Sequence, residues 1–126
     1  MQNRTILFVD DCRELRILLC AFLQRSGYKV LDAPDGLSAY ETALEYPGVI
    51  DLLVTDVEMP RMGGLALSVR LQHCRPEIKV LFISGNGKSF DAEGAFLPKP
   101  FSPSALLQKV EALFGVVPLE SSLRAQ

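Results

Sequence analysis

The strongest signal for the fold is the stretch Ile6-Leu7-Phe8-Val9-Asp10-Asp11, in which four apolar residues end in two aspartates. An uninterrupted apolar run of this kind predicts a strand buried on both faces, as in a parallel sheet that helices cover on either side. One apolar helix face follows, made of Leu15, Leu18, Leu19, Phe22 and Leu23. Ser26 and Gly27 are expected to end this helix, because glycine readily adopts the left-handed conformation common just past a helix end.

The same alternation continues along the chain. Further strands are predicted at residues 28–31, 52–54, 78–83 and 95–97. After a turn at Pro34-Asp35-Gly36, a second helix is indicated by Leu37, Tyr40 and Leu44. A final helix begins with Ser102 as its N-cap and Pro103 in the first helical position. Its apolar face consists of Leu106, Leu107, Val110, Leu113 and Phe114.

Residues 65–71 are ambiguous, because apolar and other residues alternate there with the period of a strand. We nevertheless predict a helix at this position, since two buried parallel strands need a crossover between them and that crossover is usually helical. The sequence as a whole therefore predicts an α/β domain with a doubly wound, five-stranded parallel sheet and helices on both faces.

Size and composition are those of one globular domain. The chain has 126 residues, 48% of them hydrophobic, and a formal net charge of −2. No apolar stretch approaches the length of a membrane span, and the mild acidity argues against direct binding to nucleic acid. The odd count of three cysteines, without metal-ligand spacing, indicates a cytoplasmic chain with free thiols.

Polar residues collect where the predicted strands end. Asp10 and Asp11 follow the first strand, Asp56 the third, Ser84 the fourth and Lys99 the fifth. Because the carboxyl ends of parallel strands share one edge of the sheet, these residues are expected in one crevice. Three carboxylates there repel one another unless a cation neutralises them, and oxygen ligands suit Mg²⁺. With a lysine and a hydroxyl nearby, Asp56 is the expected nucleophile that forms an aspartyl phosphate.

These residues resemble the receiver domain of two-component response regulators, a CheY-like superfamily. The resemblance rests on four pieces in order: Phe8-Val9-Asp10-Asp11, Thr55-Asp56-Val57-Glu58-Met59-Pro60 with Gly63 beyond it, Ile83-Ser84-Gly85, and Phe96-Leu97-Pro98-Lys99-Pro100-Phe101. It extends from about Thr5 to Phe114 and implies a flavodoxin-like strand order, 2-1-3-4-5. We therefore assign residues 4–115 to the domain and residues 116–126 to a C-terminal tail or linker.

The resemblance also implies roles for the matching positions. Asp56 is expected to accept a phosphoryl group from the phosphohistidine of a sensor histidine kinase or a histidine phosphotransfer protein. Asp11, Asp56 and the backbone carbonyl of Glu58 are expected to bind Mg²⁺ directly, and Asp10 through water. Lys99 is expected to pair with the phosphoryl group.

Ser84 and Phe96 are the expected switch residues, with the Ser84 hydroxyl moving toward the phosphoryl group and Phe96 turning inward. The implied function is a self-phosphorylating and self-dephosphorylating signalling domain of a phosphorelay, rather than an enzyme that turns over an external substrate. The sequence does not name its downstream target.

Other interpretations of these residues remain open. Asp11 could be the N-cap of the first helix, with Glu14 completing a capping box. The domain could be a degenerate receiver that acts through contacts alone. It could also be a Mg²⁺-dependent aspartyl phosphatase similar to the haloacid dehalogenases, although Glu58 stands where that family has a second aspartate.

One segment departs from the pattern of the family. Residues 85–94 must hold a loop, a helix and another loop, and they include Gly85, Gly87 and Gly94. We therefore expect the fourth helix to be shortened or absent.

Overall fold

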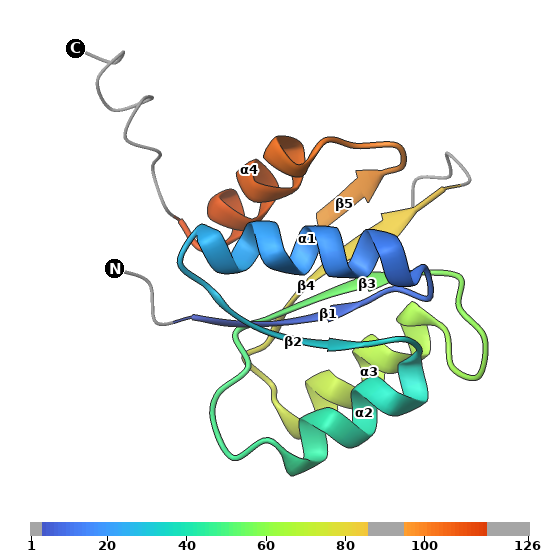
Figure 1. Ribbon diagram of the computed structural model, residues 1–126. Helices are drawn as coiled ribbons and strands as arrows, with labels where there is room; N and C mark the ends of the chain where they lie inside the picture. Colours follow the sequence, from blue (N-terminus) through green and yellow to red (C-terminus); the bar gives the residue numbers. More distant parts are fainter. Residues whose placement is uncertain (1–3, 86–94, 116–126) are drawn as a thin grey trace.

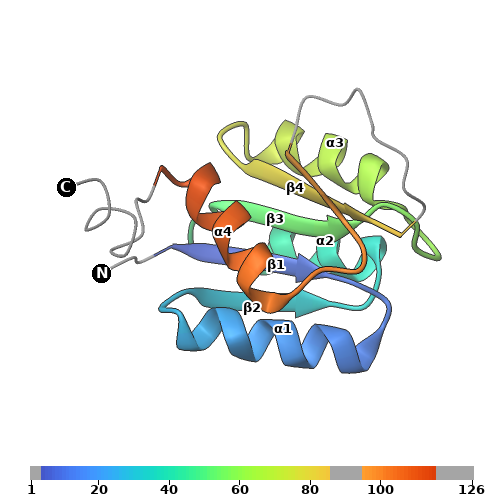
Figure 2. The ribbon, with the colours of Figure 1, turned by 90° about the horizontal axis from the view of Figure 1, so that it is seen from above.

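The apolar run that ends in Asp10 and Asp11 forms an inner strand of a parallel sheet. The computed structural model describes residues 4–85 and 95–115. The strands in these ranges are β1 (Thr5–Val9), β2 (Lys29–Ala33), β3 (Leu52–Asp56), β4 (Lys79–Ser84) and β5 (Ala95–Pro98). They pair in the order β2-β1-β3-β4-β5, and Figure 2 shows β1 and β3 side by side with their arrowheads at the same edge. The predicted strand order is confirmed.

Helices cover both faces of the sheet, as predicted. Those in the described residues are α1 (Arg13–Arg25), α2 (Gly36–Glu45), α3 (Gly64–Cys74) and α4 (Pro103–Leu113). In Figure 1, α1 and α4 lie on one face, and α2 and α3 lie on the other. None of the helices in the described ranges combines the length and the apolar character needed to cross a membrane.

Two predictions fall on other parts of the chain. The shortened fourth helix was expected within residues 85–94, of which only Gly85 is described. The C-terminal tail or linker, residues 116–126, also lies outside the described residues.

The alternating side chains of β1 supply both halves of the core. Ile6 and Phe8 pack on the side of α1 and α4, with Leu19, Leu23, Leu106 and Val110 among their neighbours. Leu7 and Val9 pack on the opposite side, with Ala39, Ala43, Leu67 and Leu71. All five residues of β1 are buried, which explains why the strand reads as a continuous apolar run rather than an alternating one.

Residues 65–71 are helical, which confirms that the strand-like alternation there is misleading. The buried residues of α3 are Gly64, Leu67, Ser68 and Leu71, spaced as one face of a helix. Leu65 and Val69 belong to the same alternating pattern but are 39% and 67% exposed. The need for a crossover between β3 and β4 therefore outweighs the local pattern.

Two residues of the apolar patterns that predict α1 and α2 lie outside the core. Leu18 of α1 and Leu44 of α2 are 55% and 59% exposed. The buried face of α2 is formed instead by Gly36, Ala39 and Ala43. Small side chains on this face let the helix lie close to the sheet and to α3.

Side-chain caps fix the starts of α2 and α4. Ser102 accepts a hydrogen bond from the Ala105 amide at 3.1 Å, as predicted for α4. Asp35 was assigned to a turn, but it is the N-cap of α2 and accepts from the Ser38 amide at 2.8 Å. The hydrogen bonds from Ser38 lower the pKa of the buried Asp35 carboxyl.

Replacing Asp35 should therefore destabilise the domain. We expect Asp35→Ala to reduce the free energy of unfolding by about 1 kcal/mol at neutral pH, and Asp35→Asn, which can still cap, to cost less. Because the folded-state pKa is lowered, this contribution is complete above the ordinary aspartate pKa and is lost as the pH falls through the folded-state pKa. Urea denaturation of wild type and Asp35→Ala should show a gap that narrows in acid. A gap that widens in acid would contradict the assignment.

Candidate functional site

Strand register brings the acidic residues together. β1 and β3 pair in parallel with Val9 opposite Thr55, so Asp10 and Asp56 come next on neighbouring strands at the carboxyl edge. β4 pairs with β3 so that Ile83 lies opposite Asp56, and β5 pairs with β4 so that Pro98 lies opposite Ser84. Lys99 follows directly. The five predicted site residues at the strand ends therefore lie along one edge of the sheet.

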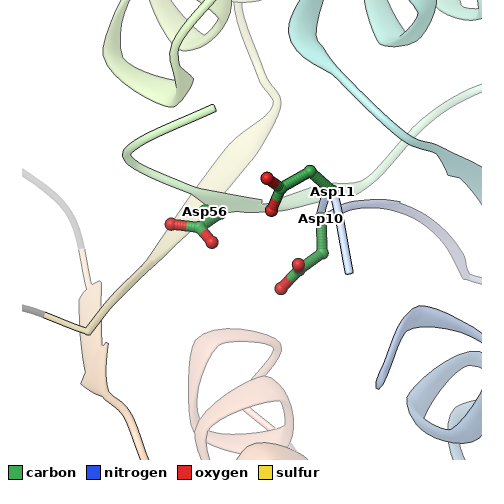
Figure 3. A group of neighbouring side chains, drawn as sticks. All are labelled: Asp10, Asp11 and Asp56. Carbon is green, nitrogen blue, oxygen red and sulfur yellow. The ribbon is translucent and has the colours of Figure 1, made fainter. Parts of the chain in front are cut away.

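Three carboxylates form a compact cluster at this edge. Asp10, Asp11 and Asp56 each contribute an oxygen atom, and these oxygens all lie within 4.8 Å of one another. Figure 3 shows the three side chains gathered at the ends of β1 and β3. Asp10 and Asp56 are buried, whereas Asp11 is exposed. The cluster is thus open to solvent on the side of Asp11.

Asp10 is the most enclosed member of the cluster, with no exposed surface. Its Oδ1 accepts a hydrogen bond from the Cys12 amide at 2.8 Å. Its Oδ2 is buried and has no hydrogen-bond partner among the described residues, although Lys99 Nζ lies 3.3 Å away. Burial raises the pKa of this carboxyl, since it disfavours the charged form more than Cys12 and Lys99 favour it.

Within residues 4–85 and 95–115, Lys99 is the cation that contacts carboxylates of the cluster. Its Nζ donates a hydrogen bond to Asp56 Oδ2 at 3.0 Å. Burial acts to lower the pKa of Lys99, but Asp56 and Asp10 outweigh that effect and raise it. The Lys99 amide also donates to the Ser84 carbonyl at 2.8 Å, which ties the residue after β5 to the end of β4.

The loop after β3 is held close to Asp56. The Glu58 amide donates to Asp56 Oδ1 at 3.2 Å, so each carboxylate oxygen of Asp56 has a donor. The Val57 amide bonds to the Ile83 carbonyl, and the Gly64 amide to the Val57 carbonyl, both at 2.9 Å. A Cβ atom at Gly64 would collide with the Asp56 carbonyl oxygen. Glycine is therefore required where α3 begins against the end of β3.

The two predicted switch residues lie on β4 and β5. Ser84 is buried at the end of β4. Phe96 of β5 is half-buried and packs against the core half that contains Leu7 and Val9. The register of the sheet places Phe96 opposite Phe82.

The alternative role of Asp11 as a helix cap is wrong. The N-cap of α1 is Cys12, which makes no side-chain capping bond. The Cys12 amide is bound by Asp10 instead, so the Asp11 carboxylate has no capping role in α1.

Arg16 was not predicted as a site residue. Its Nη1 donates to the Asp10 carbonyl oxygen at 2.7 Å, and its Nε donates to Asp32 Oδ2 at 3.0 Å. The sequence gives no signal for this contact beyond a basic residue in the first turns of the helix.

The chemistry of this donor set fits a hard divalent cation. The available ligand atoms are carboxylate oxygens, which Mg²⁺ prefers. One of them, Asp10 Oδ2, is buried and has no hydrogen bond among the described residues. Lys99 neutralises only one of three negative charges. A divalent ion on the exposed side, near Asp11, would balance the remainder.

Comparison with known proteins agrees with this geometry. Residues 6–111 match the family described as the response regulator receiver domain. The response regulator receiver protein CpdR of Brucella abortus is 35% identical over 118 residues, which cover 87% of this chain and 96% of CpdR. The chain belongs to the response regulator receiver domains.

Other relatives show this domain in different settings. The sensor kinase CckA of Brucella abortus is 37% identical over 118 residues, which cover 88% of this chain but only 12% of CckA. The crystal structure of a receiver domain from the hybrid histidine kinase CckA superposes with a TM-score of 0.76 at 37% identity, covering 86% of this chain and 96% of that one. TrrA of Thermotoga maritima, solved in complex with Mg²⁺-BeF, gives a TM-score of 0.73 at 28% identity, covering 87% and 98%.

Membership of this family fixes the broad role of the chain. Receiver domains are signalling domains of two-component systems, and they interact with sensor histidine kinases. The predicted family and fold are both confirmed.

The buried carboxylate of Asp10 should cost the receiver domain stability when no divalent cation is present. We expect Asp10→Asn to raise the free energy of unfolding in EDTA, because it removes a buried charge whose Oδ2 lacks a hydrogen bond. We expect MgCl₂ to stabilise the wild type more than this variant. Urea denaturation with EDTA and with MgCl₂ measures both effects. A variant that is less stable in EDTA would contradict this view of Asp10.

Proposed function

We propose that the chain is the phosphoacceptor of a two-component phosphorelay. In this proposal an oxygen of the Asp56 carboxylate attacks the phosphorus of a partner's phosphohistidine. The phosphorus–nitrogen bond breaks, and the imidazole leaves. The observation that carries the proposal is the cluster of three carboxylates with Lys99 3.0 Å from Asp56, because this constellation can hold both a metal ion and a phosphoryl group.

Each neighbour of Asp56 has a separate task in this proposal. Lys99 already donates to Asp56 Oδ2, and we propose that it pairs with the phosphoryl oxygens after transfer. The Glu58 amide donates to Oδ1, which holds the carboxylate at a fixed angle for the attack. Asp56 is buried, so little water competes with the incoming group.

The metal in this proposal is Mg²⁺. Asp11, Asp56 and the backbone carbonyl of Glu58 would bind it directly, and Asp10 through water. When bound, Mg²⁺ neutralises charge on the phosphoryl oxygens and on the crowded carboxylates. The oxygen-only donor set supports this choice, and TrrA, a relative of this chain, was solved with Mg²⁺-BeF.

Phosphorylation is proposed to act as a conformational switch. A dianion on Asp56 favours the state in which Lys99 and the Ser84 hydroxyl close on it, and Phe96 then turns inward. The position of Ser84 at the end of β4, joined to Lys99 through its carbonyl, supports this coupling.

We further assign residues 4–115 to the receiver domain and residues 116–126 to a tail or linker. The partner that supplies the phosphoryl group would be a sensor histidine kinase or a histidine phosphotransfer protein. We place the domain in the cytoplasm, and its free cysteines, Cys12, Cys20 and Cys74, suit a reducing compartment. In this proposal the chain carries a phosphoryl group and does not turn over an external substrate.

The first test is the mass of the intact protein after incubation with MgCl₂ and acetyl phosphate. We expect one phosphoryl adduct on the wild type, none in EDTA, and none on Asp56→Asn. No adduct on a folded wild type that also fails to bind Mg²⁺ would contradict the proposal and favour a receiver that acts through contacts alone. Steady release of phosphate from added phosphomonoesters would favour the aspartyl phosphatase.

The switch has its own test, which is the response of the Phe96 region to phosphorylation. We expect the adduct to shift the amide resonances of β4 and β5 in NMR spectra of the wild type. In Ser84→Ala the adduct should still form, while the shifts around Phe96 become much smaller, because the hydroxyl that links the two is missing. Equal shifts in both proteins would exclude Ser84 from the switch.

A further inference from the structure

Arg16 contacts the backbone of the acidic cluster and connects α1 with the ends of β1 and β2. It belongs to the first turns of α1, and only 12% of its side chain is exposed. Its guanidinium donates from Nη1 to the Asp10 carbonyl oxygen at the end of β1, at 2.7 Å. It also donates from Nε to Asp32 on β2, at 3.0 Å. One side chain thus ties together the ends of β1 and β2 and the beginning of α1.

The carbonyl that Arg16 holds belongs to the peptide group between Asp10 and Asp11. The orientation of this peptide plane fixes ψ of Asp10 and φ of Asp11, and so contributes to the direction in which both side chains leave the backbone. The Cys12 amide fixes the Asp10 side chain from within the turn, at 2.8 Å, and the Asp10 amide bonds to the Ala33 carbonyl at 3.3 Å. Arg16 supplies the contact to the remaining polar atom of the Asp10 backbone.

We propose that Arg16 is the positioning residue of the cation site. Its guanidinium forms a fork, with one donor on the Asp10 carbonyl oxygen and one on Asp32, and this fork holds the Asp10–Asp11 peptide in the orientation that directs both carboxylates toward the cation. This inference rests on the proposed function, in which the ion is Mg²⁺. Arg16 contacts the backbone carbonyl of Asp10 and the carboxylate of Asp32, which lies outside the cluster, so it acts through the backbone rather than as a ligand.

Charge and positioning predict opposite effects, which makes the inference testable. A positive charge beside three carboxylates weakens cation binding by repulsion, so removing it should tighten the binding of Mg²⁺ if charge alone matters. If Arg16 positions the peptide, removing it should weaken the binding. Partners of metal ligands typically contribute about 10- to 100-fold in affinity, and a partner that acts through the backbone belongs at the lower end of that range.

The experiment compares Arg16→Met with the control Arg13→Met. Methionine keeps much of the apolar stem of arginine and removes the guanidinium. Arg13 is exposed at the first residue of the same helix, so its replacement removes the same charge without the two hydrogen bonds of Arg16. Titration of ¹⁵N-labelled protein with MgCl₂, followed through the Asp11 and Cys12 amides, gives the Kd of each protein.

We expect Arg16→Met to bind Mg²⁺ on the order of tenfold more weakly than the wild type, and Arg13→Met to bind as well as the wild type or slightly better. Phosphorylation of Arg16→Met by acetyl phosphate should be slow at limiting MgCl₂ and recover at saturating MgCl₂. A loss of general stability would not produce this recovery.

Arg16→Lys separates the fork from the charge. Lysine keeps the charge but has a single point donor, so it cannot bridge Asp10 and Asp32 as a planar guanidinium does. We expect its Kd for Mg²⁺ to lie between those of the wild type and Arg16→Met. If Arg16→Met does not fold, Arg16→Lys decides the question, since binding equal to the wild type would overturn the inference.

Two further results would also overturn it. Tighter binding by Arg16→Met would mean that charge alone matters, and a Kd equal to that of Arg13→Met would mean that the fork has no role. Failure of the proposed function looks different, because the wild type itself would then bind no Mg²⁺ or take up no phosphoryl group. A wild type that binds no Mg²⁺ would overturn both the proposed function and the role of Arg16. A wild type that binds Mg²⁺ but takes up no phosphoryl group would contradict only the proposed function and leave the Kd comparison valid.

Discussion

The crowding of three carboxylates at one edge of the sheet is the constraint around which the rest of the site is arranged. Asp10 and Asp56 come to adjacent positions because β1 and β3 pair in parallel with no offset that would separate their ends. Such a cluster is tolerated in a folded protein only if its charge is balanced. Lys99 balances part of it through Asp56 and Asp10, and the remaining negative charge is what gives the site its affinity for a divalent cation.

The loop that follows Asp56 is packed tightly against the helices around the cluster. Gly64 lets α3 begin directly against the carbonyl of Asp56, and Gly36 lets α2 begin against the carbonyl of Met62 in this loop. Asp35, the cap of α2, pairs at 3.5 Å with Arg61 of that loop, and Arg61 has a φ of 73°. The loop that carries Glu58 is therefore held from α2, α3 and β4, so Asp56 sits in a fixed frame while the exposed side of the cluster stays accessible.

Much of this could be predicted from the sequence, since strand ends in a parallel sheet must share an edge and polar residues after buried strands stand out. The exposure of Leu18 and Leu44 could not be predicted, because apolar residues at helical spacing do not show which of them have room to pack in the core. Asp11 looked like a helix cap because the motif is local, whereas its actual setting depends on Asp56 and Asp10. Arg16 escaped prediction for the same reason, as its acceptors Asp10 and Asp32 converge only in the folded sheet.

Lys99 and Arg16, the two basic residues described at the site, have different roles because they contact different groups. Lys99 touches carboxylates directly, so it competes with any cation for the same oxygens and is suited to pair with a phosphoryl group once one arrives. Arg16 touches only the backbone of the cluster, and its charge is matched by Asp32, whose carboxylate is half-exposed and outside the cluster. Because Asp32 pairs with Arg16, the guanidinium can hold the Asp10–Asp11 peptide while its charge repels the cation less. An arginine without Asp32 would keep the hydrogen bond to the Asp10 carbonyl oxygen but lose the bridge to β2, and its unmatched positive charge would repel the cation.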